Sequence, residues 1–89
     1  STRYLDPRMP TVLRIGPYKF YFYPYDVLHE PPHIHVGRDR DEVKFWLDPV
    51  ELERNRGFAG HELRKIEELV RDHESKLIDA WNDVADQTP

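Results

Sequence analysis

The sequence contains no cysteine among its 89 residues, which excludes disulfide bonds and thiolate metal sites. A metal ion would therefore need histidine and carboxylate ligands. The longest uncharged apolar run is only a few residues, far below the roughly 20 that a membrane-spanning helix needs. No basic segment followed by an apolar one marks a signal peptide. These absences together predict a cytoplasmic protein.

The length allows one hydrophobic core and leaves no room for a second domain. A hydrophobic content of 38%, including many aromatic residues, predicts a packed interior rather than disorder. Residues 1–47 carry seven Lys and Arg against six Asp and Glu, whereas residues 48–89 carry six against eleven. The chain is therefore not a generally basic nucleic-acid binder, although its first half leaves room for a local basic patch.

The first eight residues show no periodicity, and Met9 is the only methionine. We expect residues 1–8 to be an N-terminal extension or an expression remnant. Residues 9–89 are then expected to form a single α+β domain.

Four segments alternate apolar and polar residues with the two-residue period of β-strands: 11–15, 18–23, 33–36 and 42–47. Gly16 and Pro17 suit a tight turn between the first two, because glycine accepts a positive φ and proline fixes its own. A polar turn at 37–41 joins the other two. Residues 24–32 between the hairpins are expected to form a loop.

The alternation divides these strands into two faces. The predicted core face holds Leu13, Ile15, Phe20, Phe22, Ile34, Val36, Val43, Phe45 and Leu47. The other face is polar or amphipathic and is predicted to be exposed to solvent; it holds Arg14, Lys19, Tyr21, Tyr23, His33, His35, Lys44 and Trp46.

Two helices are predicted in the second half of the chain. Residues 48–57 carry helix signals, with Asp48 as N-cap, Pro49 in the first turn and Gly57 at the end. A longer helix is expected over residues 60–85, where apolar residues recur at spacings of three, four and seven. Extra apolar residues, among them Trp81, widen this stripe and indicate either a break near residues 73–75 or a surface for a partner. The expected fold is an antiparallel sheet of three or four strands, made of two sequential hairpins, with both helices covering one face.

The motifs "EPPHIHV", "FWLDPVEL" and "NRGF" make residues 9–66 resemble a family of small bacterial proteins, domain of unknown function 4160. The resemblance implies a bacterial cytosolic protein, often encoded beside a second small protein of the domain of unknown function 2442 type. Such an arrangement is typical of a toxin–antitoxin pair. The family brings no catalytic residues to carry over. Its members tend to have serine before "HEL", where this chain has Ala59 and Gly60, so the helix here loses a side-chain cap.

His33 and His35 are the main candidates for chemistry, because residues two apart on a strand project from one face about 7 Å apart. They could act as the acid and base of a metal-independent ribonuclease, with cations holding the phosphate. The catalytic candidates are His33, His35, Tyr23 and Lys44, and the binding candidates are Tyr21, Trp46, Arg14, Lys19, His29 and Glu30. The tyrosines and the tryptophan could stack bases or pack under a partner chain.

Two other interpretations of the histidine pair stay open. The pair could bind zinc if His29, Glu30 or Asp26 supplied a further ligand, although no metal-binding motif is present and no metal or cofactor is assigned. Alternatively, the imidazoles could simply fill the outer face of the strand and form hydrogen bonds with neighbouring Tyr or Glu. In every case Pro31 and Pro32 would force an extended approach to His33.

We therefore expect an intracellular interaction module, one half of a toxin–antitoxin-like pair, that uses its Tyr/His/Trp face. The expected partner is the small protein encoded by the neighbouring gene; RNA and a second copy of the chain are further candidates. The ribonuclease and the zinc-binding protein are the alternatives.

Overall fold

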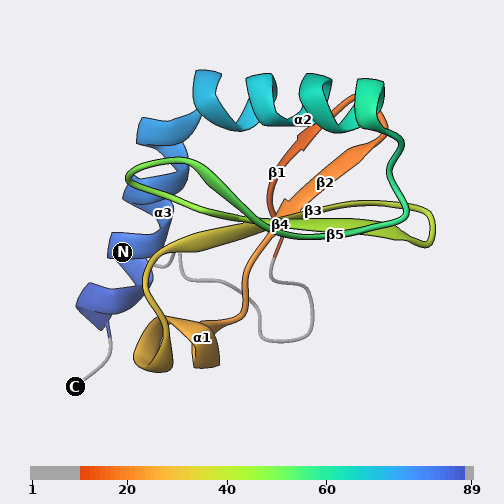
Figure 1. The fold of residues 1–89 in the computed structure, drawn as a ribbon. Helices are drawn as coiled ribbons and strands as arrows, with labels where there is room; N and C mark the ends of the chain where they lie inside the picture. The colour runs from red at the N-terminus through yellow and green to blue at the C-terminus, as the bar shows by residue number, and fades with distance from the viewer. Residues whose placement is uncertain (1–10, 88–89) are drawn as a thin grey trace.

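The computed structural model describes residues 11–87, so the expectation for residues 1–8 lies outside the described residues. Within them the fold is α+β, with an antiparallel sheet whose strands lie in chain order (Figure 1). The strands are β1 (Thr11–Ile15), β2 (Tyr18–Tyr21), β3 (His33–Arg38), β4 (Asp41–Trp46) and β5 (Glu51–Arg56). The helices are α1 (Pro24–His29), α2 (Gly60–Asp72) and α3 (Glu74–Gln87).

Both predicted hairpins are confirmed. Gly16 has a φ of 55° at the β1–β2 turn, which is the left-handed conformation that glycine adopts at no steric cost. The β3–β4 turn is tighter than expected, because only Asp39, with a φ of 56°, and Arg40 separate the two strands. The expected loop at 24–32 instead contains the short helix α1, which Pro24 begins.

The predicted helix at 48–57 is wrong. Residues 51–56 form β5, which pairs antiparallel with β4 and makes a five-stranded sheet rather than one of three or four strands. The capping signals at Asp48 and Pro49 express only a local preference, whereas the free edge of β4 offers a ladder of backbone hydrogen bonds. All six residues of β5 are exposed, so this segment has no apolar stripe to hold a helix against the sheet.

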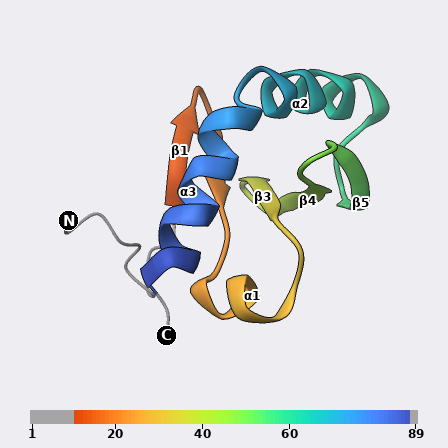
Figure 2. The same cartoon turned by 90° about the vertical axis from the view of Figure 1, so that its left-hand side faces the viewer.

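The predicted long helix is broken at His73, which separates α2 from α3 (Figure 2). Of the two explanations for the wide apolar stripe, the break is therefore the one observed. The two helices bury different parts of it: Ile66 and Val70 from α2, and Leu77, Trp81 and Val84 from α3. Within residues 11–87, no helix combines the length and apolar character needed to cross a membrane.

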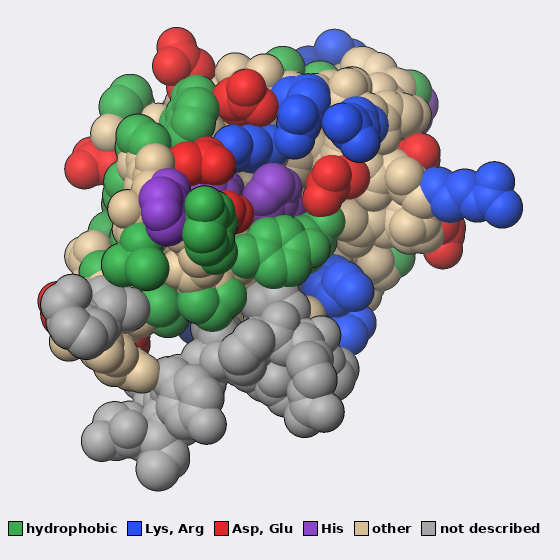
Figure 3. All heavy atoms as spheres, turned by 90° about the horizontal axis from the view of Figure 1, so that it is seen from below, with side chains coloured by type: hydrophobic (Ala, Val, Ile, Leu, Met, Phe, Trp, Pro, Cys, Tyr) green, Lys and Arg blue, Asp and Glu red, His purple; other side chains and the backbone are tan. Residues whose placement is uncertain are grey.

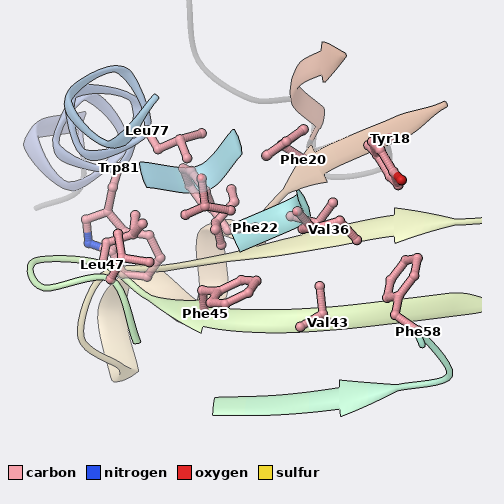
Figure 4. Close-up of a cluster of buried hydrophobic side chains, with 14 of the residues drawn as sticks. Tyr18, Phe20, Phe22, Val36, Val43, Phe45, Leu47, Phe58, Leu77 and Trp81 are labelled. Atoms are coloured by element: carbon pink, nitrogen blue, oxygen red, sulfur yellow. The ribbon is translucent and has the colours of Figure 1, made fainter. Parts of the chain in front are cut away.

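The core lies between the sheet and these two helices (Figure 4). Most of the predicted core residues are buried there, namely Phe20, Phe22, Ile34, Val36, Val43, Phe45 and Leu47. Leu13 and Ile15 are only partly buried, because β1 is an edge strand. Helix α1 lies on the opposite side of the strands from α2 (Figure 1). That side is the face predicted to be exposed.

The predicted exposure of the histidines is wrong. His33 is 0% exposed and His35 is 8% exposed, although both lie on the face opposite the core residues Ile34 and Val36. Alternation assigned the face correctly, but α1 and its flanking segments cover the middle of that face. The sheet is therefore buried on both sides along β3.

Candidate functional site

The site is built by β3 and α1, which place three titratable side chains together. The two-residue period of β3 sends His33 and His35 to the same face, and α1 brings Asp26 over them. Pro31 and Pro32 return the chain from α1 to β3, and the carbonyl oxygen of Pro32 accepts a hydrogen bond from the Leu47 amide at 3.0 Å. The predicted role of the prolines in directing the approach to His33 agrees with this path.

Both imidazoles direct Nε2 toward one carboxylate oxygen. His33 Nε2 lies 3.2 Å from Asp26 Oδ2, and His35 Nε2 lies 3.9 Å from the same atom. One ligand atom from each of the three residues lies within 4.8 Å of the others. Such spacing brings two nitrogens and one oxygen around a common centre.

The opposite ring nitrogens face other acceptors. His33 Nδ1 lies 3.1 Å from the carbonyl oxygen of Pro31, and His35 Nδ1 lies 3.5 Å from Glu42 Oε2. The latter contact does not have hydrogen-bond geometry, so among the described residues the buried Nδ1 of His35 has no hydrogen-bond partner. A neutral imidazole has one N–H only and cannot donate to acceptors at both nitrogens. A neutral His33 can therefore donate to only one of its two neighbouring oxygens, the Pro31 carbonyl or Asp26 Oδ2.

Aromatic rings enclose His35. Its ring stacks on Tyr21 with centroids 5.2 Å apart and meets the edge of Tyr23 at 6.0 Å. Burial is the main cause that lowers the pKa of His35, so this imidazole favours its neutral form. The Tyr21 hydroxyl donates a hydrogen bond to Glu42, and burial together with this bond raises the pKa of Tyr21. Glu42 thus connects Tyr21 to the Nδ1 side of His35.

His33 is sealed by the two tryptophans. Trp46 on β4 approaches its ring at 5.9 Å, and Trp81 on α3 approaches it at 5.0 Å. Trp81 also contacts the core ring of Phe22 at 4.9 Å. Trp81, which widened the predicted apolar stripe of the long helix, therefore contacts both the core and the site.

Lys44 lies at the other rim of the site but is already paired. Its Nζ donates a hydrogen bond to Glu30 Oε1 at 2.7 Å and lies 4.6 Å from the centroid of the Trp46 ring. The hydrogen bond from Lys44 is the largest cause that lowers the pKa of Glu30. Lys44 is therefore less available as a free phosphate-binding cation than we expected.

The structure brings most of the predicted site residues together, namely Tyr21, Tyr23, Glu30, His33, His35, Lys44 and Trp46. His29 is not among them: its Nδ1 bonds to the Tyr25 carbonyl oxygen at 2.8 Å, and its ring stacks on Tyr25. Arg14 and Lys19 line a neighbouring groove instead. On the face that carries the site, the histidines lie among acidic, basic and hydrophobic side chains (Figure 3).

Sequence reasoning missed two contributors and left a third undecided. Glu42 lies two residues before Lys44 and four before Trp46 on the same strand, so the two-residue period places it on the same face. Asp26 was only one of three possible ligands, because a short helix at 24–29 was not predicted. Trp81 carried no signal for the site beyond its surplus apolar character.

Comparison with known proteins gives one match. No curated protein and no solved structure is significantly similar to the chain. The family model for Domain of unknown function (DUF4160) matches residues 18–82, which is most of the chain and includes α1, the sheet from β2 onward, α2 and the first part of α3. This chain therefore belongs to the family Domain of unknown function (DUF4160), as its motifs indicated.

Proposed function

We propose that the protein binds one divalent transition-metal ion, with Zn²⁺ as the best fit, through Asp26, His33 and His35. The single observation that carries the proposal is the convergence of both Nε2 atoms on Asp26 Oδ2. Imidazole nitrogens and a carboxylate oxygen are the ligands that zinc takes in the absence of cysteine.

The surroundings of the three ligands support this assignment. Metal-bound histidines usually donate the second ring N–H to a backbone carbonyl or a carboxylate, which fixes the tautomer and the ring orientation. His33 has the Pro31 carbonyl in that position. Glu42 Oε2 lies 3.5 Å from His35 Nδ1, without hydrogen-bond geometry. If His33 donates its Nδ1–H to the Pro31 carbonyl, the lone pair of Nε2 faces the lone pairs of Asp26 Oδ2. A metal ion bound between these two atoms would remove that repulsion.

Three protein ligands leave one coordination position open. Structural zinc sites usually have four protein ligands, whereas catalytic sites have three and bind water in the fourth position. The zinc ion would lower the pKa of that water and make it a nucleophile near neutral pH. The proposed function is therefore a metal-dependent hydrolytic site rather than a structural one.

Titration of EDTA-treated protein with Zn²⁺ and Co²⁺ tests the proposal. We expect one ion per chain and a Co²⁺ absorption spectrum of nitrogen and oxygen ligation. At a hundredfold excess of zinc over its dissociation constant, mass action stabilises the fold by about 2.7 kcal/mol. Asp26→Asn and His35→Gln should each abolish the Co²⁺ spectrum.

His29→Gln is the matched control, since it removes a nearby imidazole that lies outside the cluster. It should leave metal affinity unchanged. Absence of Zn²⁺ and Co²⁺ binding to the wild type, or binding that His29→Gln removes and His35→Gln leaves intact, would overturn the proposal.

The metal-independent ribonuclease stays a prediction that uses the same groups. Burial lowers the pKa of His35, which favours a neutral base, and Asp26 would orient His33, whose Nε2 lies 3.2 Å from Oδ2, as the acid. RNA cleavage by metal-free protein in the presence of EDTA would favour this alternative.

The interaction module also stays a prediction, with a different surface from the one expected. Large apolar side chains are exposed on α1, with Tyr25 at 68% and Leu28 at 58%, and Tyr23 beside His35 is 45% exposed. The prediction placed the protein encoded by the neighbouring gene on the Tyr/His/Trp face; we now infer that it docks on α1. Copurification of the two proteins, lost in Tyr25→Ala/Leu28→Ser, is the expected result.

A further inference from the structure

A groove lies beside the site on the same face of the sheet. Its volume is about 420 Å³, and Gly37, near the end of β3, is one of the residues that line it. A Cβ built on Gly37 would lie 3.4 Å from Cε1 of Tyr21, so a larger residue at this position would press against the Tyr21 ring. Tyr21 and Glu42 line the groove and also contact His35, so they join the two places.

The strand register sets cations in rows across this face. Arg14 lies opposite Lys19, and Lys19 lies opposite Gly37. On the other side of Gly37, Glu42 lies opposite Arg56, and one row further along Lys44 lies opposite Arg54. Directly opposed residues share a face, so these cations lie on the face of the sheet that carries the histidines, and Arg14 and Lys19 line the groove. Basic side chains gather near the histidines on this face (Figure 3).

The charged side chains that line the groove differ in whether they form ion pairs. Arg38 pairs most closely with Glu62 at 2.7 Å and lies 3.4 Å from Asp39 and 3.7 Å from Asp41. Glu42 accepts the Tyr21 hydroxyl and keeps its negative charge. Within residues 11–87, no carboxylate forms an ion pair with Arg14, Lys19 or Arg40, which also line the groove. The groove therefore offers cations that are available to an anion, despite the net negative charge of the whole chain.

We propose that this groove binds the phosphates of a single-stranded polynucleotide and presents the strand to the adjacent site. The inference rests on the proposed metal site and names its ligand class. Repeated phosphates fit a row of cations better than a single small anion does, and the exposed ring of Tyr23 beside His35 can stack a base. Stacking on Tyr23 needs an unpaired base, so the face suits a single strand rather than a duplex.

Fluorescence anisotropy with labelled oligonucleotides of about 12 nucleotides, of either RNA or DNA, tests the proposal over a range of salt concentrations. Wild-type protein should bind one of the two, with an affinity that falls as salt rises. Arg14→Ala/Lys19→Ala should weaken binding at least about tenfold at low salt and reduce the salt slope by about 1.4, which is about 0.7 for each lost phosphate contact.

Arg64→Ala/Lys65→Ala is the matched control, because it removes the same two charge types from exposed positions of α2. It should leave binding unchanged. Equal losses in the two double variants, equal binding of a duplex, or no binding of any oligonucleotide would overturn the groove proposal.

Metal titration of the same variants separates this proposal from the proposed function. Arg14→Ala/Lys19→Ala should bind Co²⁺ as the wild type does, since neither residue belongs to the cluster. Oligonucleotide binding without metal binding would overturn the metal site alone. Metal binding without oligonucleotide binding would overturn the groove alone.

Discussion

The two faces of β3 are equally buried and yet chemically opposite. On one face Ile34 and Val36 are both 0% exposed and pack into an apolar core under α2 and α3. On the other face His33 and His35 are 0% and 8% exposed, and they contact Asp26, Glu42 and a ring of aromatic side chains. Burial on the first face follows from the hydrophobic effect, whereas burial of polar groups has a cost unless they are paired.

The difference shows what two-residue alternation can predict. It assigns a side chain to a face, but the exposure of that face depends on what the rest of the chain lays over it. A polar face that is covered, with an unpaired nitrogen on His35, is better explained by a function than by stability.

The largest effect is expected on the core face. Phe45→Ala should destabilise the protein by about 3–5 kcal/mol, because it leaves a cavity among fully buried side chains. Urea denaturation followed by circular dichroism measures this loss. A change below about 1 kcal/mol would mean that this face is not the main source of stability.

The histidine face should respond differently in metal-free protein. His35→Leu replaces a buried imidazole that has an unpaired nitrogen, and such a replacement is close to neutral or stabilising. We expect a change within about 1 kcal/mol in the same urea experiment. A loss as large as that of Phe45→Ala would show that the polar cluster itself holds the fold together.

Part of the loss of folding stability at low pH should come from the core side of the sheet. There Glu62 on α2 accepts hydrogen bonds from Arg38 and Tyr18. The bond from Arg38 is the largest cause that lowers the pKa of Glu62. Stability from this group is therefore present above the ordinary carboxyl pKa and is lost as the pH falls through the lowered value. Glu62→Gln should flatten the dependence of the urea midpoint on pH between neutrality and about pH 3; an unchanged profile would contradict this assignment.

The smallest change in stability is expected at the N-terminus of α2, which packs on the core face of the sheet only. Ala59 is the N-cap of α2 and makes no side-chain cap hydrogen bond, as its departure from the family pattern predicted. Ala59→Ser should stabilise the protein by about 1 kcal/mol. Co²⁺ affinity should stay the same, because α2 does not contribute to the cluster; a change in affinity would show that the two faces are coupled.

The sequence predicted much of the fold from side-chain period. Strands β1 to β4, both hairpin turns and most core residues follow from alternation, because one face of each strand had to be apolar. Segment β5 could not be found this way, since all of its residues are exposed and its pairing depends on the backbone of β4. Helix α1 was also missed, because its six residues bury no side chain and show no period.

The candidate site was predictable in part. The histidine pair was identified from its spacing, but its third member required knowing that α1 places Asp26 over β3. A contact between residues seven positions apart, one on a helix and one on a strand, has no local sequence signature. The burial of the pair was unpredictable for the same reason.

The most direct test of the central claim is anomalous scattering at the zinc absorption edge from crystals grown with Zn²⁺. The account predicts one strong peak per chain, at about 2.0–2.2 Å from Nε2 of His33, Nε2 of His35 and a carboxylate oxygen of Asp26. A peak at His29, His61 or His73 alone, or no peak at this cluster, would contradict it.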